Sequence, residues 1–105
     1  GEIKTGSVIE QLGLKNGAIV AGGVAAQTAQ AIANLKALLA EHRATLADVK
    51  KTTCFLTDID TFATFNEAYV KAFGNHRPAR STVGIAGLVG TAVVEIEAWA
   101  FKPLG

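Results

Sequence analysis

Residues 24–57 read VAAQTAQAIANLKALLAEHRATLADVKKTTCFLT and hold a long helical pattern followed directly by a strand pattern. From Val24 to about Arg43, apolar side chains recur every three or four residues, as on one face of an amphipathic helix. Gln27 and the other polar residues fall largely off this face. The face is predicted to consist of Ala25, Thr28, Ala29, Ile32, Leu35, Leu38 and Leu39. Residues 49–57 are rich in β-branched side chains and alternate in character, which predicts a strand. One side of this strand is predicted to carry Val49, Lys51, Thr53 and Phe55, and the other side Lys50, Thr52, Cys54 and Leu56.

On the amino-terminal side, residues 3–14 are strand-like and punctuated by glycine. Asn16-Gly17 follows them, and this pair predicts a tight turn because both residues tolerate positive φ. The chain is therefore expected to open with a hairpin or a tight loop.

On the carboxyl-terminal side, a second helix is predicted, with Asp60 or Thr61 as its N-cap and Gly74 as its end. It carries an aromatic stripe at helical spacing, which packing against a sheet explains most simply. The stripe consists of Phe62, Phe65, Tyr69 and Phe73. Two more strands, Ser81–Ala86 and Ala92–Phe101, are predicted to close the chain.

The resulting order, β(β)αβαββ, predicts an α+β fold in which two helices cover one face of a sheet. The other face then needs water or a partner. Along the last strand, one side is small and apolar, with Val94, Ile96, Ala98 and Ala100. The opposite side carries Val93, Glu95, Glu97, Trp99 and Phe101. A face that mixes acids with large aromatics is explained more easily by contact with another subunit than by solvent.

The composition agrees with a single domain spanning residues 1–105, because half of the 105 residues are apolar. A domain this short often gains stability by oligomerising. The net charge of +1 and the lack of a Lys or Arg run argue against a nucleic-acid partner. No apolar run approaches the roughly 18 residues of a membrane span, and no signal peptide is recognisable. Cys54, the single cysteine, is predicted to be a small buried residue, and a reducing cytoplasm is the expected location.

The segment His76–Thr82 contains the principal candidate for a functional residue, Arg80. We expect the strand beginning here to pair with the strand that carries Glu95, so that a cation able to hold a carboxylate lies near an acid able to move a proton. From the residues alone, a structural ion pair that ties the end of the strand to a neighbouring carboxylate is the favoured role of Arg80. By spacing alone, Glu97 is an equally good candidate for this acid, because it shares a face with Glu95. His42 and His76 are isolated imidazoles, so no metal site is expected.

Four segments carry a resemblance to a known family. Thr52–Asp58, Phe62–Tyr69, Arg77–Val83 and Val94–Ala98 resemble the Rid family, also called YjgF or L-PSP endoribonuclease-like. The similarity runs in order from about Gln11 to Phe101. It implies a chorismate-mutase-like α+β protomer of the bacillus type. It also implies a homotrimer whose sheets form an inner barrel, with ligand clefts between subunits.

The resemblance further implies hydrolysis of 2-imino acids, or their enamine tautomers, to 2-keto acids and ammonia without metal or organic cofactor. Arg80 matches the family arginine that holds the substrate carboxylate through two parallel hydrogen bonds. Glu95, rather than Glu97, matches the residue that activates water and returns a proton. Asn66 matches an auxiliary polar position that supports the cleft.

The start of the chain departs from the family pattern. A first strand carrying a Gly-Pro-Tyr-Ser-like segment has no counterpart here, and Ile9-Glu10 replace a Ser-Gly pair. Glu10 would place negative charge near a site for anionic substrates. Either residues near the start are missing from the chain or it represents a divergent subgroup with a rearranged cleft. Two other functions stay open: a non-catalytic trimer that binds small carboxylates such as keto acids, and a ribonuclease, against which the near-neutral charge weighs.

Overall fold

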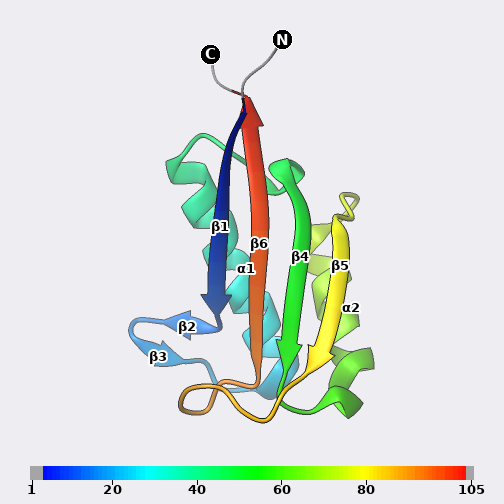
Figure 1. Cartoon of the computed structure of the whole chain (residues 1–105). Coiled ribbons are helices and arrows are strands. Elements are labelled where there is room, and N and C mark those ends of the chain that lie inside the picture. Colours follow the sequence, from blue (N-terminus) through cyan, green and yellow to red (C-terminus); the bar gives the residue numbers. More distant parts are fainter. Residues whose placement is uncertain (1–3, 104–105) are drawn as a thin grey trace.

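The computed structural model describes residues 4–103, in which a four-stranded sheet and a small hairpin are combined with two helices (Figure 1). Short 3₁₀ turns at Leu46–Asp48 and Ile59–Thr61 lead into β4 and α2. In chain order the elements are β1 (Lys4–Leu12), β2 (Leu14–Lys15), β3 (Ala18–Ile19), α1 (Gly23–Glu41), β4 (Val49–Leu56), α2 (Phe62–Phe73), β5 (Ala79–Gly84) and β6 (Val94–Pro103).

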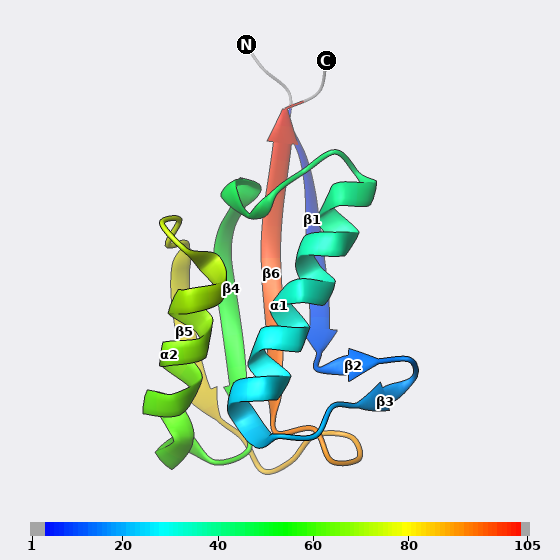
Figure 2. The ribbon, with the colours of Figure 1, turned by 180° about the vertical axis from the view of Figure 1, so that it is seen from behind.

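The sheet has the strand order β1-β6-β4-β5, with β4 and β5 parallel and the other pairs antiparallel. Both helices lie on the same face of this sheet, and the opposite face is left open (Figures 1 and 2). The predicted α+β fold with one covered face is therefore confirmed. Neither helix within residues 4–103 combines the length and apolarity needed to cross a membrane.

The predicted pairing of the Arg80 strand with the Glu95 strand is wrong. β5 pairs with β4, and β4 lies between β5 and β6. The reason is the helical connection between β4 and β5. α2 returns the chain to the end of the sheet where β4 begins, so β5 runs parallel to β4. β6 pairs with the other edge of β4 in antiparallel orientation. β5 also begins two residues earlier than predicted, because Ala79 already pairs with Lys51.

Most of the core lies between the helices and the covered face of the sheet. Its largest fully buried side chains include Ile32, Leu35, Leu56, Phe65, Val94 and Ile96. The predicted α1 face is correct at Thr28, Ile32, Leu35 and Leu39, whereas Leu38 is half-buried, Ala29 is exposed, and Ala31 and Gln27 are buried instead. The buried arc is displaced because α1 packs against α2 as well as against the sheet. α1 ends at Glu41, before the predicted Arg43, since Arg43 adopts a left-handed conformation with φ of 58°.

A β-bulge interrupts the predicted alternation of β4. The register with β6 shifts between Val49 and Lys51, so Lys50 is an extra residue. Val49 consequently lies on the buried side with Thr52 and the other core-facing residues of this strand. The predicted grouping of Val49 with Lys51 is wrong, because periodicity does not reveal an inserted residue.

The predicted turn and the predicted ends of the second helix are found in the structure. Asn16 and Gly17 have φ of 53° and 81° and join β2 to β3 in the predicted tight turn. Gly74, with φ of 67°, follows the last residue of α2. At the start of this helix, Thr61 occupies the N-cap position without a side-chain cap hydrogen bond; its hydroxyl donates to the Asp58 carbonyl at 2.6 Å.

Cys54 is fully buried in the middle of β4, as predicted. Burial raises the pKa of its thiol to about 11, although a hydrogen bond to Thr52 acts in the opposite direction. The thiol is therefore protonated and unreactive at neutral pH.

Gln27 has a structural role that its polar character concealed. Its side chain is 4% exposed and binds the segment just before β6. Nε2 donates to the Thr91 carbonyl at 3.2 Å, and Oε1 accepts from the Val93 N–H at 2.8 Å. Gly13 allows the chain after β1 to approach closely, since a Cβ there would lie 2.7 Å from the Gln27 Cα. Gln27 thus fixes the start of the strand that carries Glu95.

Replacing Gln27 with leucine is expected to destabilise the protein by about 1–3 kcal/mol, because two backbone groups lose their partner in a buried setting. Urea unfolding at fixed protein concentration measures this loss. Gln30→Leu is the matched control, since the Gln30 amide donates to Asn34 on the same helix and, within residues 4–103, to no backbone group. Equal losses in the two variants would contradict the role assigned to Gln27.

Candidate functional site

Arg80 lies on β5 and projects toward the helices. In the parallel register it stands opposite Thr52, which is fully buried on the covered side of the sheet. Its guanidinium carbon lies 4.6 Å from the ring centroid of Tyr69, 5.3 Å from that of Phe62 and 5.6 Å from that of Phe65. These are cation–π distances. The aromatic stripe of α2, predicted to be core only, therefore also supports a half-buried cation.

This arrangement suits a carboxylate anchor. Aromatic rings attract the positive charge but do not accept strong N–H···O hydrogen bonds, so the donors of the guanidinium stay available for a planar anion. Phe65 is fully buried and holds the inner side, whereas Phe62 is 38% exposed at the outer side. Arg80 is thus fixed by rings yet accessible from outside. Spacing along α2 placed the three rings on one face, but their contact with Arg80 depends on the neighbouring strand.

Asn66 lies on α2 and is half-buried. It follows Phe62 by four residues and precedes Tyr69 by three, so it neighbours both positions on the helix surface. The structure thus places Asn66 on the element that supports Arg80, on the helical side of the sheet.

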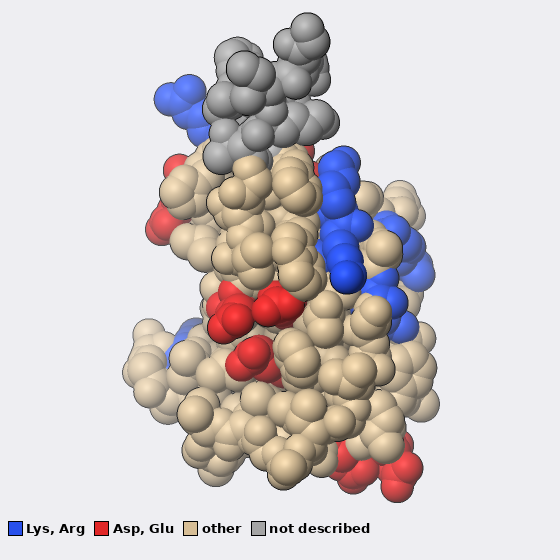
Figure 3. Space-filling model, in the orientation of Figure 1, with Lys and Arg blue, Asp and Glu red and all other residues tan. Residues whose placement is uncertain are grey.

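Glu95 lies on the opposite, open face. It pairs with Phe55 on β4 and with Leu12 on β1, and it is half-buried. Glu97 lies on the same face, directly across from Glu10. Figure 3 shows acidic side chains gathered at the centre of this face, with basic side chains beside them toward β4 and β5. Burial raises the pKa of Glu95, and the negative charges of Glu10 and Glu97 raise it further.

The structure therefore separates the predicted site residues. Arg80 shares the covered side with Thr52, and Glu95 shares the open side with Phe55. Because neighbouring residues in register point to the same side of a sheet, the sheet itself stands between the guanidinium and the carboxylate. The two groups cannot act on one substrate within a single chain.

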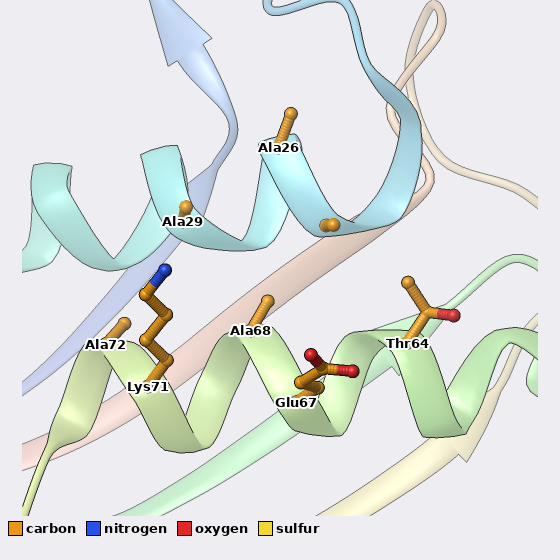
Figure 4. Close-up of a pocket in the computed structure, with 8 residues that line it drawn as sticks. Ala26, Ala29, Thr64, Glu67, Ala68, Lys71 and Ala72 are labelled. Carbon is orange, nitrogen blue, oxygen red and sulfur yellow. The ribbon is translucent and has the colours of Figure 1, made fainter.

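A groove between α1 and α2 does not include these residues. It has a volume of about 650 Å³ and is open on the outer side of the helical layer (Figure 4). Its lining consists of Ala25, Ala26, Ala29, Thr64, Glu67, Ala68, Lys71 and Ala72. His76, in the segment that precedes β5, is hydrogen-bonded through Nε2 to the Val49 carbonyl at 2.7 Å.

Substituting Glu10 by glutamine is expected to lower the pKa of Glu95 toward its ordinary value, because one of the two charges that raise it is removed. A raised carboxyl pKa gives stability that is present below the ordinary glutamate pKa and is lost as the pH rises through the raised value. Glu10→Gln should accordingly stabilise the protein near neutral pH. Carbon-13 NMR titration of the Glu95 carboxyl measures the shift, with Glu41→Gln, at the far end of α1, as control. An unchanged Glu95 midpoint in Glu10→Gln would disprove the coupling.

Comparison with known proteins agrees with the fold. An α+β protomer with two helices on one sheet face defines the class, and the sequence model described as Endoribonuclease L-PSP matches residues 5–102. The chain belongs to this family, the Rid or YjgF family, as predicted.

Named relatives differ in their described roles. The chain is 45% identical over 82 residues to a Lactococcus lactis protein named as a regulator, AldR, covering 78% of this chain and 65% of that protein. It is 37% identical over 94 residues to human 2-iminobutanoate/2-iminopropanoate deaminase, covering 88% and 69%. The crystal structure of RidA from the Antarctic bacterium Psychrobacter sp. PAMC 21119 superimposes with a TM-score of 0.85 at 33% identity, covering 96% and 85%. The chain thus spans about two thirds of the length of these two curated relatives.

Proposed function

We propose that this chain is the protomer of a metal-free deaminase that hydrolyses 2-imino acids, or their enamine tautomers, to 2-keto acids and ammonia. The observation that carries the proposal is the guanidinium of Arg80, held against three rings with its donors available for a carboxylate. The similarity to a protein named 2-iminobutanoate/2-iminopropanoate deaminase supports the choice of substrate.

In the proposed reaction, Arg80 holds the substrate carboxylate and so fixes the imine carbon. Glu95 removes a proton from water, the water oxygen bonds to the imine carbon, and the π electrons of the C=N bond move to nitrogen. The protonated Glu95 then returns its proton to nitrogen. Glu95 next moves the proton of the new hydroxyl group to nitrogen as the C–N bond breaks, so that the nitrogen leaves as ammonia and the carbonyl of the 2-keto acid forms. Asn66 is proposed as an auxiliary polar contact of the substrate.

The site is proposed to form between subunits, because the sheet separates Arg80 from Glu95 within one chain. A second copy must then supply the acid. The open face suits such a contact, since Val8 is 55% exposed beside the half-buried ring of Trp99 and the acids. We infer a homotrimer in which these faces form an inner barrel, as the family resemblance implies.

A second candidate is binding of 2-keto acids without turnover. The observation that favours it is Glu10, which helps to raise the pKa of Glu95 and thereby disfavours the ionised form needed as a base. A ribonuclease is the third candidate, and the net charge of +1 gives it no support.

A 2-imino acid generated in situ by an amino-acid oxidase tests the proposal. The deaminase predicts that keto acid forms several-fold faster with the protein than with buffer alone. No acceleration together with saturable binding of 2-oxobutanoate would select the binding function instead. If neither is observed, both carboxylate functions are wrong, and RNA cleavage that Arg80→Ala abolishes would then indicate the nuclease.

A further inference from the structure

A buried hydrogen bond connects the sheet to the ring nearest to Arg80. The Thr52 hydroxyl and the Tyr69 hydroxyl are 2.7 Å apart, and both residues are almost completely buried. Thr52 is the residue opposite Arg80 in the β4–β5 register. The Tyr69 ring, in turn, is the closest of the three rings to the guanidinium, at 4.6 Å. Thr52, Tyr69 and Arg80 therefore form a continuous contact path.

This path restrains the ring in several directions. The hydrogen bond to Thr52 fixes the hydroxyl end of Tyr69, and the rings of Phe65 and Phe73 pack at 5.6 Å and 4.6 Å from its centroid. Burial raises the pKa of the phenol, so Tyr69 is neutral at physiological pH. The guanidinium consequently faces a fixed, uncharged ring.

Arg80 needs such support because of where it lies. β5 is at the edge of the sheet, with a single neighbouring strand among the described residues. An arginine side chain is long and loses conformational freedom when it binds a ligand, so fixing it beforehand improves affinity. The rings of α2 provide that restraint.

We propose that Tyr69, anchored by Thr52, is a positioning residue that holds the Arg80 guanidinium ready for the substrate carboxylate. The inference rests on the proposed function, since it takes Arg80 as the carboxylate anchor. It adds that carboxylate affinity depends on a side chain that does not itself touch the ligand.

Calorimetric binding of 2-oxobutanoate to the assembled protein tests this inference. Tyr69→Leu is expected to weaken binding by about tenfold, because the cation–π support is lost. Its kcat for imine hydrolysis should change less than its KM. Phe73→Leu is the graded control, since Phe73 packs against Tyr69 but is not one of the three rings around the guanidinium; it should lower the Tm and weaken binding far less than Tyr69→Leu does. Weakened binding in Phe73→Leu equal to that in Tyr69→Leu would overturn the proposal.

Two milder variants keep the test valid if Tyr69→Leu fails to fold. Tyr69→Phe and Thr52→Val each remove the same hydrogen bond while keeping the ring, so each is expected to weaken binding by about two- to threefold. Their effects should not add in the double variant. Wild-type affinity in both single variants would overturn the role of the anchor.

The Arg80 Nε–H resonance gives a readout that does not require a ligand. The Tyr69 ring, the nearest of the three, should displace it in the wild type and in Tyr69→Phe, and Tyr69→Leu should leave only the smaller displacement due to Phe62 and Phe65. If Arg80→Ala loses 2-oxobutanoate binding while Tyr69→Leu binds like the wild type, the positioning role is wrong and the proposed function stands. If Arg80→Ala itself binds like the wild type, the anchor and the positioning role both fail, even where the resonance shows the ring contact.

Discussion

Arg80→Ala is expected to lower kcat/KM for 2-imino acid hydrolysis by about 10²- to 10³-fold, because the substrate loses both its charge-assisted hydrogen bonds and its orientation. The fold should survive, since Arg80 is half-buried on an edge strand and contacts ring surfaces that can stay packed without it. The measurement is the rate of keto-acid formation from imine generated in situ.

The controls for Arg80 separate charge from geometry. Arg77→Ala removes a nearby exposed arginine whose Nε donates to the Gly74 carbonyl, and it should retain activity within about twofold. Arg80→Lys keeps the charge but loses the planar pair of donors, so its activity should be intermediate. Equal activity of Arg80→Ala and the wild type would refute the carboxylate-anchor role.

Glu95→Gln is expected to reduce kcat by about 10²- to 10⁴-fold, because glutamine keeps the shape of the side chain but cannot accept and return a proton. Glu97→Gln is the matched control on the same face, and it should have a much smaller effect. The reverse ranking would assign the proton transfer to Glu97, which spacing alone had left equally eligible.

Mixing the two inactive variants tests the assembly of the site. Arg80 and Glu95 face opposite sides of one sheet, so a working site needs each residue from a different chain. Co-expression of Arg80→Ala and Glu95→Gln in equal amounts should restore about a quarter of the wild-type activity, as expected for random assembly into a closed ring. Activity as low as that of the separate variants would exclude a site shared between chains.

Local signals in the sequence were sufficient for much of the fold. The helical spacing through Ile32 and Leu35, the Asn16-Gly17 turn and the two-sided last strand all appear in the structure. Each depends on residues close together in the chain, where spacing reports directly on which side chains share a face. The motif around Arg80 likewise indicated the family, which the comparison confirms.

Long-range contacts account for what the sequence did not reveal. The burial of Gln27 depends on backbone groups more than 60 residues away in the chain, and the support of Arg80 by Tyr69 depends on how β5 lies beside α2. Neither has a local period that a pattern could detect.

The sequence by itself determined the order of elements, the two faces of β6 and the family, because these follow from side-chain character along short stretches. Only the tertiary structure decided that β4 lies between the strands carrying Arg80 and Glu95 and that these residues face opposite sides. Strand order is set by which edges meet when the helices pack, a choice that no single stretch encodes. That choice is the physical basis for proposing a site between two chains.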